Sequence, residues 1–164
     1  MICSTEKYFQ KNKTIKKGFT LSEVLVVLGM LSVISVVVFS IFITFRKSQS
    51  LDLDVETIVE TLNQARSQTL SSYNGSVYGV HFIYPKIILF TGNTYSANDS
   101  LNKEILLNAS NVTLTTSLVG GGSDVIFNRL TGSTAQSGTI VLSAPSISKT
   151  KTINIYSTGL IETQ

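Results

Sequence analysis

The chain has 164 residues, of which 43% are apolar and only 14% are charged, so it forms about one domain with an unusually apolar composition. Five of its thirteen basic residues lie in the first eighteen positions, against a single acid, Glu6. The remainder carries eight basic and nine acidic residues, so the formal charge of +3 does not indicate a nucleic-acid-binding surface. The single cysteine, Cys3, excludes a disulfide framework and a thiolate metal cluster.

The N-terminal third of the chain has the pattern of a membrane segment. Residues 1–18 are polar and basic, and a run of 22 residues without a charge or a proline extends from Val24 to Phe45. A helix of this length crosses the hydrocarbon core of a bilayer. Because five lysines precede the run and only Arg46 and Lys47 follow it closely, we predict a single span with the N-terminus in the cytoplasm. A secretory signal peptide is the alternative, but no small-residue cleavage site follows the run.

A second helical pattern extends from Leu51 to Ser72, with one apolar stripe at steps of three and four residues. Since no proline or glycine lies between Met30 and Ser72, we expect one continuous helix of about fifty residues. The acids near residues 52–56 are interpreted as a solvated face and not as a metal site. The stripe consists of Val55, Ile58, Val59, Leu62, Ala65 and Thr69, and the outward polar positions include Asp52, Asp54 and Glu56.

Beyond the breaker Asn74-Gly75, the apolar period changes to two. Two runs that end at Tyr84 and Phe90, joined by a turn at Tyr84-Pro85-Lys86, predict a β-hairpin. A polar loop follows up to Asn102, with Tyr95 expected to pack inward. Further strands are predicted at Glu104–Leu107, Val112–Val119, Val125–Leu130, Thr139–Ala144 and Thr150–Ser157, with an extended piece around Leu160-Ile161. The predicted fold class is α+β, a long N-terminal helix packed on an antiparallel β head.

The predicted head is poor in residues that carry catalysis. Its one histidine, His81, lies in a strand and is interpreted as a packed or rim residue. A Ser-His-Asp set could be formed with Asp99 or Asp124, but no nucleophile-elbow motif supports it. Glycines 120–122 lack the following residues of a phosphate loop and predict a turn. We therefore expect no catalytic residue, no metal site and no cofactor.

The positions of the aromatic and basic side chains in the head do not indicate a ligand-binding site. The aromatics fall at strand spacing, which favours core packing, and the basic residues are scattered and not grouped with aromatics, which gives weak support to a nucleic-acid platform. The aromatic residues are Tyr78, Phe82, Tyr84, Phe90 and Phe127, and the basic residues are Lys86, Lys103, Arg129, Lys149 and Lys151.

Glu23 is a carboxylate directly before the apolar run, and its charge at this position requires an explanation. An unpaired ionised carboxylate is costly there. One interpretation places Glu23 at headgroup level, where the dipole at the start of a helix favours an acid. The other is that Glu23 needs a partner, which another copy or subunit supplies.

The segment Lys16-Lys17-Gly18-Phe19-Thr20-Leu21-Ser22-Glu23 with the apolar run resembles the class III signal and first helix of type IV pilins and type II secretion pseudopilins. The resemblance implies cleavage after Gly18 by prepilin peptidase and N-methylation of the new first residue, Phe19. It also implies that Glu23, the fifth mature residue, pairs with the N-terminal amine of a neighbouring subunit during assembly. The implied partners are the prepilin peptidase/N-methyltransferase, other pilins or pseudopilins of the filament, and the inner-membrane assembly platform.

The head is similar to the GspH/FimT-type minor pseudopilins. Some FimT-like members bind DNA through an arginine-bearing motif after the final glycine, whereas Gly159 is followed here by Leu-Ile-Glu-Thr-Gln, so we do not expect DNA binding. The similar stretches are Val55–Gln68, Tyr78–Phe82, Ile126–Gly132 and Ile153–Ile161. With both resemblances, residues 1–18 are a leader peptide, 19–45 the transmembrane half of the helix, 46–72 its amphipathic half and 73–164 the β-rich head.

The resemblances imply a non-enzymatic minor pilin or pseudopilin, anchored in the inner membrane with its head outside and assembled into a type IV pilus or a type II secretion pseudopilus. A DNA-uptake or adhesion subunit whose head binds a ligand is the first alternative. A membrane-anchored enzyme or receptor is the second, and it predicts no processing at Gly18 and a clustered polar pocket in the head.

Overall fold

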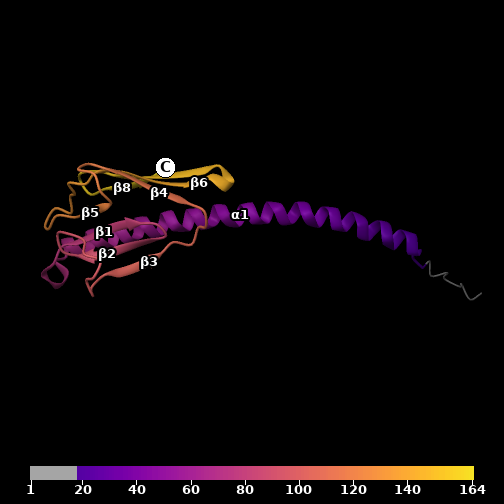
Figure 1. The fold of residues 1–164 in the computed structure, drawn as a ribbon, viewed down its shortest axis with the longest axis horizontal. Coiled ribbons are helices and arrows are strands. Elements are labelled where there is room, and N and C mark those ends of the chain that lie inside the picture. Colours follow the sequence, from indigo (N-terminus) through magenta and orange to yellow (C-terminus); the bar gives the residue numbers. More distant parts are fainter. Residues whose placement is uncertain (1–17) are drawn as a thin grey trace, which may run out of the picture. The chain divides into compact units, whose positions relative to one another are not determined.

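The computed structural model describes residues 18–164, and the chain divides into two units between Ser40 and Ile41. One helix, α1 (Leu21–Leu70, 50 residues), continues through this division and is drawn in indigo to purple in Figure 1. The prediction of one long helix is confirmed. The helix ends at Leu70 and not at Ser72, because Ser72 has a left-handed backbone (φ 49°) that cannot continue it.

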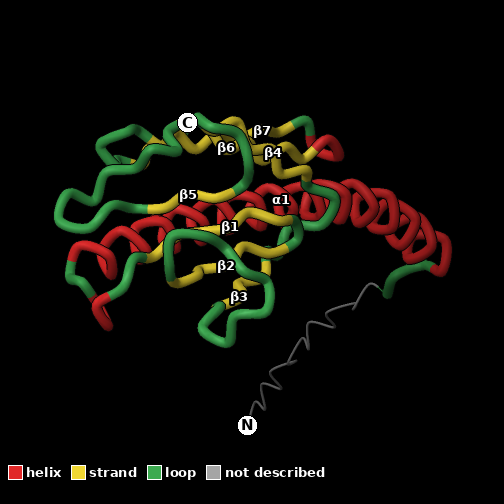
Figure 2. The backbone as a smooth tube through the Cα atoms, turned by 60° about the vertical axis from the view of Figure 1, so that its left-hand side comes forward, coloured by secondary structure: helices red, strands yellow, loops and turns green. Residues whose placement is uncertain are grey.

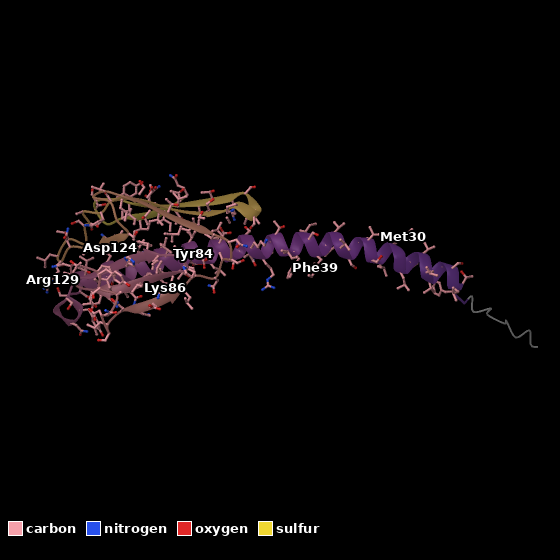
Figure 3. The ribbon with its side chains drawn as sticks, viewed as in Figure 1. Met30, Phe39, Tyr84, Lys86, Asp124 and Arg129 are labelled. Atoms are coloured by element: carbon pink, nitrogen blue, oxygen red, sulfur yellow. The ribbon has the colours of Figure 1, made fainter. Side chains whose placement is uncertain are left out.

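Up to Ser40 the described chain consists of α1 and the three residues before it. Every large apolar side chain from Val24 to Phe45 is at least 41% exposed, and Figure 3 labels Met30 and Phe39 on this part of α1. Within residues 18–164, α1 is the one helix long and apolar enough to cross a membrane. The Ser32 and Ser35 hydroxyls donate to helix carbonyls at 2.7 and 2.8 Å, so they are satisfied without water.

The unit from Ile41 onward contains two four-stranded sheets in which every strand pair is antiparallel. Figure 2 draws the strands in yellow. The strand order is β3-β2-β1-β5 in one sheet and β4-β6-β7-β8 in the other. The predicted α+β fold class is therefore confirmed. The strands are β1 (Tyr78–Ile83), β2 (Lys86–Thr91), β3 (Lys103–Leu106), β4 (Thr113–Leu118), β5 (Asp124–Ile126), β6 (Gly138–Ala144), β7 (Lys149–Ile155) and β8 (Ile161–Thr163), with 3-10 turns η1 (Tyr73–Gly75) and η2 (Pro145–Ile147).

The core lies between the C-terminal part of α1 and both sheets. The predicted stripe is confirmed at five positions, while Val59 is half-buried at its edge. The prediction of a solvated face is wrong for Asp54, which is 0% exposed, whereas Asp52 and Glu56 are exposed. The buried side chains of α1 are Leu51, Asp54, Val55, Ile58, Thr61, Leu62, Ala65 and Thr69.

The predicted hairpin and most predicted strands are present, but the strand predicted at Val125–Leu130 ends at Ile126. After the buried Phe127, the Asn128 N–H donates to the Ser133 carbonyl at 2.8 Å, so the chain forms a turn instead of continuing the sheet. Leu130 lies in this turn with φ 73° and 87% exposure. The hydrophobic pattern does not distinguish this exposed leucine from a strand residue.

Four of the five aromatic residues predicted to pack in the core are at most 6% exposed, but the prediction is wrong for Tyr84. Tyr84 is 37% exposed, because it lies in the turn after β1, where its hydroxyl donates to the Ala109 carbonyl at 2.7 Å. The four confirmed residues are Tyr78, Phe82, Phe90 and Phe127.

Gly79 in β1 leaves the space that the Phe90 ring occupies. A Cβ atom at residue 79 would lie 2.6 Å from Phe90 Cζ and 2.8 Å from the Val125 carbonyl oxygen. We expect Gly79→Ala to lower the free energy of unfolding by about 1–3 kcal/mol, because a close-packed site has no room for the methyl group. Thermal unfolding of the full-length chain in mild detergent measures this as a melting temperature lowered by several degrees.

Gly29→Ala is the matched control for Gly79→Ala, since a Cβ at residue 29 has no neighbour within 4 Å. Alanine has the higher helix propensity, so the control should unfold at or slightly above the wild-type temperature. Equal melting temperatures for the two variants would contradict the close packing at Gly79.

Candidate functional site

The start of α1 presents the residues that the sequence singled out. Gly18, Phe19 and Thr20 precede the first helical residue, and the Phe19 side chain is 81% exposed. The Glu23 backbone N–H donates to Thr20 Oγ1 at 3.3 Å, so Thr20 acts as the N-cap with an acid three positions later. The Gly18–Phe19 peptide bond therefore lies in an exposed, non-helical part of the described chain. The rest of the predicted leader lies outside the described residues.

The Glu23 carboxylate is exposed, and residues 18–164 provide no ion pair or hydrogen-bond donor for it. Its place in the first turn of α1 fits the interpretation in which the helix dipole favours an acid. In the described chain, the other interpretation requires a second molecule to supply the cation. The two interpretations are compatible, since a dipole-stabilised carboxylate can also accept an ion pair.

In the head, the structure brings His81 and Asp124 together. They lie opposite each other in the β1–β5 pair, with His81 Nδ1 2.5 Å from Asp124 Oδ1, and Figure 3 labels Asp124 at this edge of the head. Asp99 instead accepts the Leu101 N–H at 2.9 Å. Among the described residues, no hydroxyl group is hydrogen-bonded to His81, so the pair lacks the nucleophile of a triad.

The His81 ring also holds the loop between β2 and β3. Tyr95 from this loop stacks on His81 with the ring centroids 3.9 Å apart, and its edge meets the buried Phe90 ring at 5.7 Å. His81 retains 19% side-chain exposure, and Tyr95 is half-buried. The predictions of a packed or rim histidine and of an inward-packed tyrosine are confirmed, and both residues serve to fasten the loop to the sheet.

Three of the five basic residues of the head form ion pairs. Lys86 contacts Glu104 at 2.5 Å, while Lys149 and Lys151 contact Asp52 on α1 at 2.9 and 3.9 Å. These ion pairs neutralise three of the positive charges that a nucleic-acid platform would need. The expectation that the head does not bind DNA stays a prediction, which these pairs support.

The C-terminal strand β8 presents a carboxylate. The Tyr156 hydroxyl donates to Glu162 Oε2 at 2.9 Å, and this hydrogen bond, together with the Glu162 charge, raises the pKa of Tyr156 above its usual value. Nearby, Arg66 of α1 donates from Nε to the Gly132 carbonyl at 3.1 Å. A Cβ at Gly159 would collide with that same carbonyl oxygen, so this glycine permits the close approach.

The glycines at 120–122 form the connection between β4 and β5, and their φ values of 86°, 72° and 88° are all in the left-handed region. Glycine adopts these angles without the steric penalty of other residues, so the predicted turn is confirmed. Within residues 18–164 no group of three or more His, Cys, Asp or Glu side chains converges on a position for a metal ion.

Asp54 is a buried structural residue, although its sequence pattern predicted a solvated position. Its Oδ1 accepts the Asn108 N–H at 2.7 Å, and its Oδ2 accepts the Ala109 N–H at 2.8 Å. Both donors belong to the loop between β3 and β4. One buried carboxylate on α1 thus fixes that loop by two charge-assisted hydrogen bonds.

These features define a pilin-like α+β protein: a long N-terminal helix with an uncovered apolar part, and two antiparallel sheets packed on its later turns. The family model described as type II transport protein GspH matches residues 54–159, more than half of the chain. The chain therefore belongs to the GspH family, whose members are pseudopilins of the type IV pilin superfamily. Comparisons with curated proteins and with solved structures found no match.

GspH pseudopilins are structural components of type II secretion, so the chain is not an enzyme. The sequence resemblance to this family is confirmed. The matched range begins within α1 and does not include Gly18, Phe19 or Glu23, and the roles of these residues stay predictions.

Proposed function

We propose that this chain is a minor pseudopilin that is cleaved between Gly18 and Phe19, methylated on Phe19 and assembled into the pseudopilus of a type II secretion system. The observation that carries the proposal is the start of α1. An exposed junction outside the helix is followed by the N-cap Thr20, an acid without a partner among the described residues, and a long uncovered apolar surface. Membership of the GspH family supports the secretion system as the destination.

Before assembly, residues 19–45 hold the chain in the inner membrane with the leader, residues 1–18, in the cytoplasm. The apolar length and the excess of lysines before it support this topology. The amphipathic residues 46–72 and the head, residues 73–164, lie outside, where the second half of α1 forms the core of the head.

Assembly replaces lipid around the apolar part of α1 with the helices of other pseudopilins. Cleavage creates a new amine on Phe19, and the Glu23 carboxylate of an adjacent subunit pairs with it. Once both groups are removed from water, each needs the other, because an uncompensated buried charge is strongly destabilising. Prepilin peptidase, the neighbouring pseudopilins and the inner-membrane platform are the partners that this sequence of events requires.

Intact-mass measurement of the chain isolated from its native membrane tests the processing step. We expect the loss of residues 1–18 and the addition of one methyl group to Phe19. Gly18→Leu should retain the leader, because the exposed junction would no longer offer glycine to the peptidase, whereas Gly29→Ala should be processed like the wild type. A mature chain that begins at Met1 would overturn the proposal.

A further inference from the structure

A cavity of about 270 Å³ with a mixed polar and apolar lining lies beside the first turns of α1 that follow the apolar run. Its wall combines α1, the β3–β4 loop and the end of β6 with η2, which are three separate parts of the sequence. The lining residues that matter below are Ile43, Arg46, Lys47, Ser50, Ser110 and Ser146.

The loop that forms one wall of the cavity is fixed from two sides. Asp54 accepts the backbone N–H groups of Asn108 and Ala109, and the Tyr84 hydroxyl donates to the Ala109 carbonyl. Ala109 is 5% exposed, so these bonds hold the loop in a single place against the core. The cavity is therefore a built feature of the head.

The polar part of the cavity lining includes two cations and three serine hydroxyl groups, and apolar side chains form the rest of the lining together with Asn108. Arg46 and Lys47 contribute two positive charges, and no ion pair involving either is present within residues 18–164. Neighbouring carboxylates have other partners, since Asp52 pairs with Lys149 and Lys151, and Asp54 accepts backbone N–H groups. Guanidinium, ammonium and hydroxyl donors without a carboxylate in the lining form a site for an anion with several oxygens, such as a phosphate.

We propose that this cavity binds the phosphate of an anionic phospholipid headgroup. This inference rests on the membrane placement given under Proposed function. Phe45 ends the charge-free run, and the headgroup layer outside the hydrocarbon core is about 5–7 Å thick. At about 1.5 Å per helical residue, Arg46 and Lys47 lie within that layer and Ser50 lies at its outer edge.

The side chains around the cavity distinguish a lipid from a free phosphate ion. The Arg46 guanidinium lies 6.0 Å from the centre of the Phe42 ring, which directs it back toward the apolar run. Ile43 contributes to the cavity itself and is 41% exposed. A phosphate in the cavity would thus have apolar surface beside it for an acyl chain, which a free ion would not use.

Native mass spectrometry of the full-length chain released from nanodiscs tests the proposal. The nanodiscs contain phosphatidylcholine with an equal amount of phosphatidylglycerol, and the retained lipids are counted for each chain. We expect wild type to prefer phosphatidylglycerol about thirtyfold, from two basic residues near the surface. Ser110→Asp, which places a carboxylate in the cavity, and the double variant R46Q/K47Q should both reduce the preference to below about threefold.

The matched controls make the same charge changes elsewhere. Ser100→Asp alters an exposed loop serine, and K103Q/R129Q removes two cations of the head outside the cavity lining. Both should keep the wild-type preference. Equal retention of the two lipids by wild type, or an unchanged preference in Ser110→Asp, would overturn the proposal.

Inorganic phosphate at millimolar concentration separates the two sources of the anion. We expect it to leave the bound lipid in place, and complete displacement would identify a free-anion site and overturn the lipid assignment. The lipid assay uses the unprocessed chain, so its result does not depend on cleavage at Gly18. A chain that keeps its leader in cells but prefers phosphatidylglycerol would refute the proposed function alone, whereas a processed chain without the preference would refute only this inference.

Discussion

Glu23→Gln is expected to leave cleavage and methylation intact and to reduce incorporation of the chain into pseudopili by at least about a hundredfold. Removing one partner of a buried ion pair costs about 3–5 kcal/mol, and every 1.4 kcal/mol is a factor of ten in an equilibrium. In the proposed filament, glutamine would leave the Phe19 amine of the adjacent subunit without a counter-charge. The measurement is the ratio of pseudopilus-bound to membrane-bound chain, with intact masses taken for both fractions.

The local structure allows this substitution to isolate the charge. Thr20 Oγ1 accepts the backbone N–H of residue 23, not its side chain, so the N-cap and the start of α1 should persist in the variant. Glu60→Gln provides the matched control, since it neutralises an exposed carboxylate of α1 outside the apolar run. Normal incorporation of Glu23→Gln, or an equal loss in Glu60→Gln, would show that Glu23 does not pair during assembly.

The elements that the sequence predicts correctly are those set by local patterns. Helix α1 follows from an apolar run and a heptad-like stripe without a breaker, and the β1–β2 hairpin follows from alternation around Tyr84-Pro85-Lys86. The candidate processing site is also contiguous, because Gly18, Phe19 and Glu23 lie within six residues. Each of these predictions depends on neighbours in the sequence, which a single chain displays in full.

The features that the sequence does not predict depend on pairings between distant segments. The division of the strands into two sheets sets β5 beside β1, and this pairing alone selects Asp124 over Asp99 as the partner of His81. The cavity behind Arg46 requires α1, the β3–β4 loop and β6 to meet. No periodicity encodes these juxtapositions, since each residue is ordinary in its own stretch.

The burial of Asp54 was partly predictable, because its position in the helical pattern indicates a buried face. It lies three residues after Leu51 and four before Ile58, both fully buried, so helical geometry places it on the apolar face of α1. Its acidic type favoured the solvated interpretation, since carboxylates are rarely buried without a partner. The partner is two backbone N–H groups from more than fifty residues away, and sequence alone does not reveal them.

Asp54→Ala is therefore expected to be among the most destabilising substitutions of a polar residue in the unit from Ile41 onward, with a loss of about 3–6 kcal/mol in the free energy of unfolding. Hydrogen bonds to a charged group contribute about 1.5–3 kcal/mol each, and two would be lost. Asp54→Asn retains one carbonyl oxygen as an acceptor and should lose about half as much. Thermal unfolding of the full-length chain in mild detergent gives the order of the variants.

Asp52→Asn provides the control, since Asp52 is an exposed carboxylate two residues away whose lysine contacts are at the surface. Such surface pairs contribute about 0–1 kcal/mol to the free energy of unfolding.

Hydrogen exchange adds a local measurement of the role of Asp54. In Asp54→Ala the peptide containing the Asn108 and Ala109 amides should exchange faster, because both donors lose their acceptor. Unchanged exchange there would contradict the role of Asp54 even if the variant were less stable. Asp54→Ala should also weaken the preference for phosphatidylglycerol, because Asn108 and Ala109 form one wall of the cavity and the variant loosens their loop.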